Sequence, residues 1–300
     1  MINLYLTTKS YRITVWEGLR KEGFESVICP SRTRPLLIDD LCAIATGAPS
    51  KIGIKNTSIH TKWNKVSDAL YTELYFKDTE LLMHEFFYNQ EFTNWCCGTH
   101  LAYIHPQIST VLTNVSKDKY IVCFIGSSTP SKRWPAENWI QLIQLCKDTH
   151  LPAIIIAGGK TDIDMAKYIE KETNATGTVG KMSLVKTLYQ IANAAAVITN
   201  DTMAAHAAAS FNKPTIIIAN GNNYYRFTDY KQPNIDTIYP EIFKSKLKNA
   251  NEPLLHYTAV TKDIASIKAI TVFDRLQSII AKSGNNSFFA TVIPKNIITT

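Results

Sequence analysis

The sequence predicts an α/β protein with two domains, and three observations indicate this. From residue 120 onward, short β-branched runs alternate with helix-sized segments, the pattern of βαβ units around a parallel sheet. The 300 residues are 45% hydrophobic and 19% charged, which suits one large or two medium buried cores. A polar interruption at residues 113–119 separates this regular half from a less regular first half.

The composition excludes several classes of protein. Glycine and proline number only twelve each, which excludes collagen-like and low-complexity chains. No apolar run approaches the roughly 18–20 residues that span a bilayer. The net charge of +7 is scattered along the chain, so it fits phosphorylated substrates, anionic membranes or nucleic acid about equally well. The charge alone therefore identifies no partner.

The cysteines and the first residues indicate the compartment. The six cysteines contain no C-x-x-C pair, and we expect buried thiols in a reducing environment. A secretory signal has a basic region followed by an apolar stretch and a cleavage site, and the first residues show none of this pattern. The expected location is the cytoplasm.

The second half contains five apolar segments that we expect to form strands covered on both faces. They are residues 120–125, 153–157, 177–179, 196–199 and 215–219. The first connecting helix places Trp139, Ile143 and Cys146 at helical spacing after Pro135, and the second begins at a capping sequence around Asp162. Further helices are expected at residues 184–194, 203–210 and 270–281.

The first half is expected to form a smaller α/β domain. Strands are predicted at 26–29 and 51–54, and helices at 11–21, 35–46 and 79–88. The predicted organisation is therefore a domain over residues 1–118, a second over 119–282, and a tail over 283–300.

The segments that follow the strands carry the residues suited to phosphate chemistry. Parallel sheets bind ligands at the carboxyl ends of their strands. Residues 126–135 contain Gly126, Ser127, Ser128 and Lys132, and residues 158–162 contain two glycines and an aspartate. Residues 200–206 enter a helix whose free N–H groups suit an anion. Together these segments predict a cleft for a nucleoside diphosphate.

Each of these residues also has an ordinary structural interpretation. Asp201 is a preferred helix N-cap residue, and Asp162 suits the first turn of a helix. Lys132 would be a solvated lysine, Trp134 a core aromatic and His206 a packed histidine. No dinucleotide or P-loop fingerprint occurs in the sequence, which disfavours a dehydrogenase. The ordered occurrence of these residues, each after its strand, favours a binding site.

The same ordered set resembles the C-terminal half of glycosyltransferase family 9, the lipopolysaccharide heptosyltransferases. The resemblance covers roughly residues 120–230, with a weaker similarity at 32–54 and in the last helix. The elements that carry it are Gly126 with Lys132-Arg133-Trp134-Pro135, then Ala157-Gly158-Gly159, Gly180-Lys181-Met182-Ser183-Leu184, Asn200-Asp201-Thr202 with His206, and Lys213-Pro214-Thr215.

The resemblance implies a GT-B-like fold of two Rossmann-like domains, with the C-terminal domain holding a nucleotide sugar. It implies an inverting transfer of heptose from ADP-heptose to the lipopolysaccharide core, with no metal or cofactor and no nucleic acid partner. The acceptor would place the protein at the inner face of the inner membrane, with peripheral association. Lys132 would neutralise the donor diphosphate as the glycosidic bond breaks, a form of electrostatic leaving-group stabilisation.

The remaining roles also come from the resemblance. Asp201 and Thr202 would contact the sugar and phosphates, and Asp162 would face the ribose. Met182 and Ser183 would line the nucleobase pocket. The other residues expected to bind substrate are Gly126, Ser127, Ser128, Gly158, Met203 and His206.

The sequence departs from the family in four respects. Asp162 is shorter than the family's ribose-binding glutamate, and Phe124-Ile125 replaces a His-Pro before Gly126. Met203 stands where the family has a glycine that allows close backbone approach to phosphate, so the donor geometry is expected to differ. The first 24 residues contain no match to the family's Gly-Asp loop, whose aspartate is the expected general base. The N-terminal domain is therefore expected to be reduced or truncated, and Glu17, Asp39 and Asp40 are candidate replacements for the base.

Two functions therefore remain open. The first is an inverting glycosyltransferase, and the second is a non-catalytic protein that keeps the sugar-nucleotide-binding fold but lacks the base. Loss of a general base would cost the transfer roughly 10²- to 10⁴-fold in rate.

Overall fold

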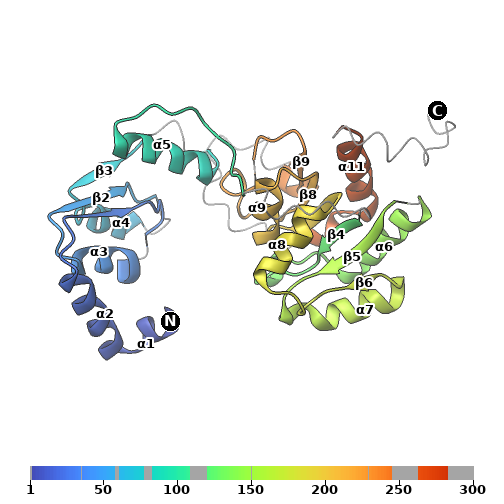
Figure 1. The fold of residues 1–300 in the computed structure, drawn as a ribbon, viewed down its shortest axis with the longest axis horizontal. Coiled ribbons are helices and arrows are strands. Elements are labelled where there is room, and N and C mark those ends of the chain that lie inside the picture. Colours follow the sequence, from blue (N-terminus) through green and yellow to red (C-terminus); the bar gives the residue numbers. More distant parts are fainter. Residues whose placement is uncertain are drawn as a thin grey trace. The chain divides into compact units, whose positions relative to one another are not determined.

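The structure is a computed structural model that describes residues 2–34, 36–57, 61–77, 83–108, 120–149, 151–228, 230–244 and 263–282. The chain divides into two compact units, Met1–Tyr103 and Ile104–Thr300 (Figure 1). The expected boundary segment at 113–119 and the expected tail at 283–300 lie outside the described residues.

The first unit contains a small parallel sheet with helices between its strands. Its strands are β1 (Ser26–Cys29), β2 (Ser50–Ile54) and β3 (Glu73–Tyr75), in the spatial order β1-β2-β3. The helices are α1 (Ile2–Thr7), α2 (Lys9–Lys21), a π-helical turn (Leu36–Asp40) that continues into α3 (Leu41–Ala45), α4 (Thr61–Asp68) and α5 (Glu85–Cys97). The predicted strands at 26–29 and 51–54 are confirmed, whereas β3 and α4 were not anticipated.

The predicted helix at 79–88 was placed too early. The helix α5 begins at Glu85, because the ring Nδ1 of His84 accepts the backbone N–H of Phe86 at 3.1 Å and caps its first turn. It ends at Gly98, whose left-handed backbone (φ 62°) terminates the helix. Residues 78–82 lie outside the described residues.

The second unit is a six-stranded parallel sheet in the order β6-β5-β4-β7-β8-β9. Its strands are β4 (Tyr120–Phe124), β5 (Ala153–Ala157), β6 (Thr176–Gly177), β7 (Ala196–Asn200), β8 (Thr215–Ile218) and β9 (Ile235–Ile238). All five predicted strands are present. β6 is shorter than expected because the chain turns at Gly180 (φ 70°), and β9 was missed in a segment rich in Asn, Tyr and Pro.

Helices cover both faces of this sheet. On one face, α6 (Ala136–Asp148), α7 (Ile163–Thr173) and α11 (Ala269–Lys282) pack against strand residues such as Ile121, Cys123 and Ile198. On the other, α8 (Leu184–Asn193) and α9 (Met203–Ser210) pack against the alternate residues Val122 and Val197. This alternation explains why the strands are apolar nearly throughout.

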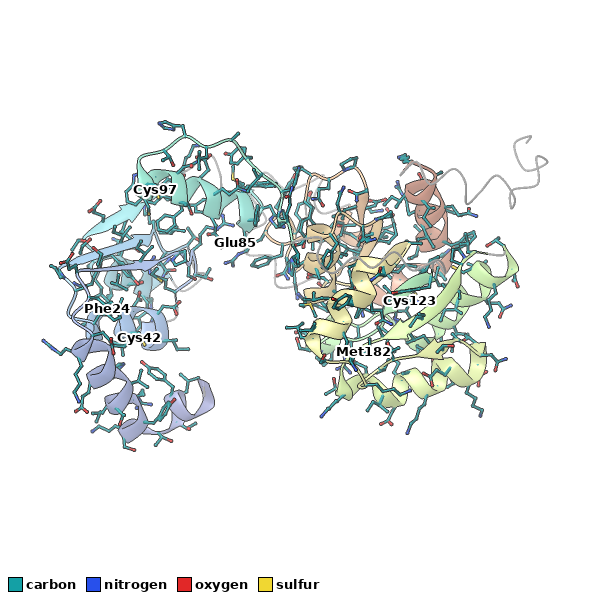
Figure 2. The ribbon with its side chains drawn as sticks, in the orientation of Figure 1. Phe24, Cys42, Glu85, Cys97, Cys123 and Met182 are labelled. Carbon is teal, nitrogen blue, oxygen red and sulfur yellow. The ribbon has the colours of Figure 1, made fainter. Side chains whose placement is uncertain are left out.

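The cysteines are free, as expected, but not uniformly buried. Cys123 on β4 and Cys146 on α6 are buried, and burial raises the pKa of both thiols, to about 12 for Cys146. Cys97 is exposed at the end of α5, so the expectation of burial was wrong for this residue (Figure 2). In the described parts of the chain, no helix has the length and apolarity needed to cross a membrane.

Candidate functional site

A cavity of about 500 Å³ lies at the carboxyl ends of strands β4, β5 and β7. Its walls come from the loops after these strands and from the first residues of α8 and α9. Ten of the twelve residues predicted to form the site line this one cavity: Gly126, Ser127, Ser128, Lys132, Gly158, Asp162, Met182, Asp201, Thr202 and Met203. The topology of the sheet therefore brings together residues that are up to 77 positions apart, from Gly126 to Met203.

Lys132 and Asp201 form an ion pair in this cavity. Lys132 ends a short 3₁₀ turn (Pro130–Lys132), and Asp201 follows directly after β7. Lys132 Nζ lies 2.7 Å from Asp201 Oδ2, and the two side chains are only 15% and 3% exposed. Lys132 is thus not a solvated surface lysine. Asp201 is not the N-cap of α9 either, since Thr202 occupies that position.

Asp162 links the loop after β5 to the loop after β4 through a hydrogen bond and an ion pair. Its Oδ2 accepts the backbone N–H of Gly159 at 2.8 Å, and its Oδ1 lies 3.6 Å from the guanidinium of Arg133. The carboxylate also packs against Gly126, where no side chain would fit. Asp162 is 5% exposed and reaches the cavity.

Buried side chains hold the Lys132 turn against the sheet. Asn200, fully buried, donates from Nδ2 to the backbone oxygens of Ile125 (2.8 Å) and Gly126 (3.2 Å), and its Oδ1 accepts the Trp134 N–H at 3.2 Å. Trp134 is also fully buried, and its indole Nε1 donates to the Ile267 carbonyl at 2.9 Å. For Trp134 the ordinary interpretation as a core aromatic is therefore correct.

Two predicted site residues do not line the cavity. Ser183 is the N-cap of α8, and its Oγ accepts the backbone N–H of Lys186 at 3.4 Å. His206 lies on α9, where its Nδ1 contacts the hydroxyl of Tyr230 and its ring meets Phe227 edge-on. Burial, followed by the nearby Asp201 charge, raises the pKa of Tyr230.

Three polar residues of the site were not assigned a role from the sequence. Arg133 pairs with Asp162, Asn200 joins the two loops, and Asn223 donates from Nδ2 to Asp201 Oδ2 at 2.8 Å. The position of Asn200 directly before Asp201 was the available signal for that residue. Asn223 lies in an Asn-rich segment after β8, and its partner is 22 positions away, so spacing alone did not reveal it.

The candidate bases of the first unit differ in their surroundings. Asp40 is fully buried, and its Oδ1 accepts from Arg34 Nε at 3.1 Å, so its carboxylate is committed to an internal ion pair. Partial burial, followed by the adjacent Asp40 charge, raises the pKa of Asp39. Glu17 borders an apolar hollow between α2 and α3. The geometry does not single out one of the three as a base.

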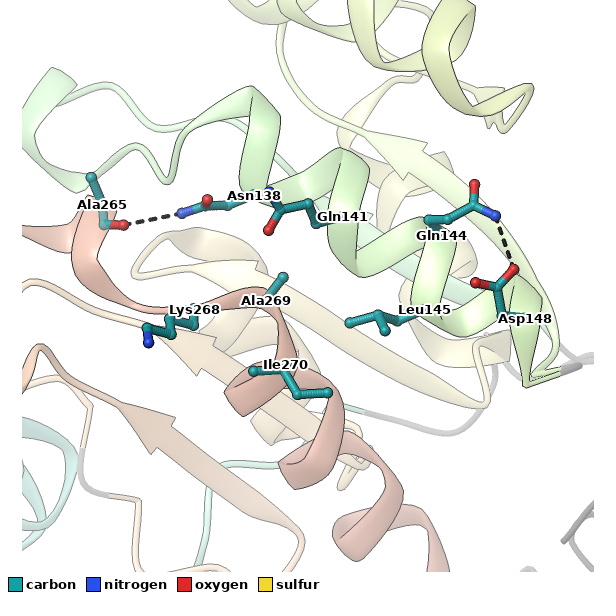
Figure 3. A pocket seen from close by; sticks show the side chains of 9 residues that line it. All are labelled: Asn138, Gln141, Gln144, Leu145, Asp148, Ala265, Lys268, Ala269 and Ile270. Carbon is teal, nitrogen blue, oxygen red and sulfur yellow. Dashed lines mark hydrogen bonds between the residues drawn. The ribbon is translucent and has the colours of Figure 1, made fainter. Parts of the chain in front are cut away.

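A second hollow of the second unit, of about 410 Å³, lies between α6 and α11 (Figure 3). Three of its polar side chains already bond to protein groups, with Asn138 Nδ2 donating to Ala265 O at 3.2 Å and Gln144 Nε2 to Asp148 Oδ1 at 2.9 Å. None of the predicted site residues lines it. Nowhere in the described residues do three or more His, Cys, Asp or Glu side chains form a group that could hold a metal ion.

Comparison with solved structures shows the fold. The structure of a family 9 glycosyltransferase from Veillonella parvula DSM 2008 matches 92% of this chain and 80% of its own, with a TM-score of 0.68 and 16% identity. The E. coli heptosyltransferase WaaC with ADP matches 90% of this chain and 78% of its own, with a TM-score of 0.67 and 18% identity. The predicted GT-B-like α/β class is therefore confirmed.

Sequence comparison shows the family. Lipopolysaccharide heptosyltransferase 1 of E. coli strain K12 is 28% identical over 109 residues, which are 36% of this chain and 34% of the relative. The enzyme of the same name from Salmonella typhimurium strain LT2 is 28% identical over 101 residues, 34% and 32% of the two chains. These matches span about a third of each curated relative. The model of glycosyltransferase family 9 (heptosyltransferase) matches residues 15–236, well over half of the chain, and the chain therefore belongs to this family.

Proposed function

We propose that the chain binds a nucleotide sugar in the cavity of the second unit and transfers the sugar to a glycan acceptor. The observation that carries the proposal is the Lys132–Asp201 pair, which lies 2.7 Å apart in a cavity at the strand ends. A cation beside a carboxylate suits a diphosphate joined to a sugar, because the cation would attract the phosphates and the carboxylate could accept hydrogen bonds from sugar hydroxyls. The names of the relatives support heptose from ADP-heptose as the donor, and a lipopolysaccharide core as the acceptor.

In the proposed reaction an acceptor hydroxyl attacks the anomeric carbon from the face opposite the diphosphate, which inverts that centre. The bond between the anomeric carbon and the diphosphate oxygen breaks, and its electron pair stays on the diphosphate. Lys132 then neutralises the developing charge, where a preorganised cation contributes most. The acceptor proton passes to a general base. The reaction as proposed uses no metal ion and no cofactor.

The other cavity residues take supporting roles in the proposal. Asp162, held by Arg133 and the Gly159 N–H, faces the ribose, and Thr202 at the start of α9 contacts a phosphate. Met182 borders the nucleobase. Ser183 and His206 stand outside the cavity and are not part of the proposed contacts. With a glycolipid acceptor, the protein would work at the inner face of the inner membrane through peripheral association.

The test is turnover of ADP-heptose. Purified protein is incubated with ADP-heptose and lipopolysaccharide that lacks its core heptose, and release of ADP is measured. We expect Lys132→Ala to lower kcat about 10²- to 10³-fold, because it removes the cation at the leaving group. Lys160→Ala is the matched control, since it removes an exposed lysine of the neighbouring loop that does not line the cavity.

The same assay separates transfer from binding alone. The burial of Asp40 in its ion pair with Arg34 favours the alternative of a binding protein without transfer, because it removes one candidate base. Binding of ADP and ADP-heptose in a calorimeter without release of ADP would establish this alternative. Equal turnover by the parent chain and Lys132→Ala would show that the leaving-group role is wrong.

A further inference from the structure

The loop after β8 is anchored firmly beside the cavity. Asn220 is 1% exposed, and its Nδ2 donates to the carbonyl of Ser131 at 2.9 Å, within the turn that carries Lys132. Its Oδ1 accepts the backbone N–H of Asn222 at 3.1 Å. Gly221 has a positive φ of 95° and packs so closely on Phe243 that a Cβ would lie 2.5 Å from the ring. The loop therefore has little freedom, and the backbone that leads to residue 223 follows a fixed path.

Asn223, two residues after Gly221, bonds to the same Asp201 oxygen as Lys132. Asn223 Nδ2 donates to Asp201 Oδ2 at 2.8 Å, and Lys132 Nζ lies 2.7 Å from the same Oδ2. The backbone carbonyl of Asn223 accepts the N–H of Phe227 at 3.0 Å and the hydroxyl of Thr228 at 3.2 Å, which fixes the backbone that carries the amide. Asp201 is thus held by one charged donor and one neutral donor.

A bound diphosphate would affect the bonds of Lys132 and Asn223 to Asp201 differently. The Lys132 ammonium would be attracted to the phosphates as well as to Asp201, so its bond to Asp201 would weaken. The Asn223 amide carries no charge and would keep its bond to the carboxylate. A carboxylate that is 3% exposed is costly to leave without donors. Asn223 would therefore keep Asp201 in place at the moment when Lys132 turns to the donor.

We infer that Asn223 is a positioning residue for sugar recognition, which holds the Asp201 carboxylate toward the sugar of the bound nucleotide sugar. The inference rests on the proposed function. It extends the site to the loop after β8, which contains none of the residues predicted to form the site. Its consequence is specific. Asn223 matters for the sugar part of the ligand and hardly for the nucleoside diphosphate, which Lys132 and the loops after β4 and β5 would hold.

The experiment compares two probes, ADP and ADP-heptose, by titration calorimetry on the full chain. The ratio of their Kd values isolates the contribution of the sugar. For Asn223→Ala we expect this ratio to shift about tenfold against ADP-heptose, the usual worth of one hydrogen bond to a charged group. The Kd of ADP itself should stay within about threefold of the parent value, whereas a general distortion of the loop would weaken both probes.

Two further variants complete the test. Asn222→Ala changes the neighbouring, exposed asparagine. The hydrogen bond from its backbone N–H to Asn220 does not involve the side chain, so we expect the parent ratio. Asn223→Ser keeps a small polar residue suited to a loop, but its hydroxyl is too short to reach Asp201, so the ratio should shift as in Asn223→Ala even if that variant folds poorly. A parent-like ratio in Asn223→Ser, or equal losses for both probes, would overturn the inference.

The failure of the proposed function has a different signature. If the parent chain binds neither ADP nor ADP-heptose, the proposed function fails, and the inference fails with it. If the parent binds both probes and the Asn223 variants keep its ratio, only the positioning role is wrong.

Discussion

The carboxylate of Asp162 occupies the space that a side chain on Gly126 would need. A Cβ built on Gly126 would lie 1.9 Å from Asp162 Oδ2, closer than any real contact. Gly126 is thus required by the close approach of two loops. We predict that Gly126→Ala displaces Asp162, lowers the free energy of unfolding by about 1–3 kcal/mol, and weakens ADP binding at least about tenfold. Urea unfolding and titration calorimetry measure the two effects.

Gly159→Ala is the control for this prediction. A Cβ on Gly159 would lie 3.5 Å from the same oxygen, an ordinary van der Waals contact, and the backbone φ of −82° suits alanine. Its unfolding free energy is expected to stay within about 1 kcal/mol of the parent. Equal destabilisation of the two variants would show that the close approach at Gly126 is not the cause.

Trp134 is expected to be a major contributor to the stability of the second unit. Its side chain is fully buried, it meets Trp139 edge-on at 4.9 Å, and its Nε1 donates to the Ile267 carbonyl. Trp134→Phe removes ring volume and the shorter of two hydrogen bonds to that carbonyl, which keeps only the Asn138 Nδ2 donor at 3.3 Å. We predict a loss of about 2–4 kcal/mol in the free energy of unfolding, measured by circular dichroism in urea. Trp63→Phe, at a 58% exposed position, should change it by less than about 0.5 kcal/mol.

Much of the second unit could be predicted because local pattern and tertiary environment agree there. Strands such as β5 are apolar along their length, since helices cover both faces of the sheet. The rule that ligands meet the carboxyl ends of parallel strands then points to Lys132, Asp162 and Asp201 from the sequence alone. Their meeting in one cavity follows from the order of the strands.

The parts that escaped prediction depend on contacts distant in sequence. β9 forms because Ile235–Ile238 pairs with β8, although the sequence on either side of it is typical of a polar loop. The N-terminus of α5 depends on a cap from His84, a residue seldom used for that purpose. Asn223 is indistinguishable from Asn222 in the sequence, and only the backbone path after Gly221 decides which of the two faces Asp201.

The cysteines should differ strongly in reactivity. Cys97 is exposed, whereas Cys123 and Cys146 are buried, and burial raises the pKa of both of these thiols. Because the thiolate is the reactive form, we predict that iodoacetamide at pH 8 modifies Cys97 in the folded protein and spares Cys123 and Cys146. Peptide mass spectrometry identifies the modified residues. The same reaction in urea is the control, in which all three should react.

The stability of the second unit is predicted to fall in alkaline solution through Tyr230. Burial raises the pKa of this tyrosine above its usual value of 10, and the Asp201 charge adds to the shift. As the pH rises through 10, the unfolded chain therefore loses the Tyr230 proton while the folded chain keeps it. The unfolded state is favoured by up to about 1.4 kcal/mol per pH unit for each such group.

Tyr230→Phe has no proton to lose at this position, so its unfolding free energy should decline less between pH 9 and pH 11 than that of the parent. The substitution also removes the contact with His206, which changes stability at every pH and leaves the slope unaffected. Urea unfolding at several pH values measures the slope. Tyr168→Phe, at an exposed position on α7, should keep the parent slope, and the same slope in Tyr230→Phe would mean that Tyr230 ionises as readily in the folded chain as in the unfolded one.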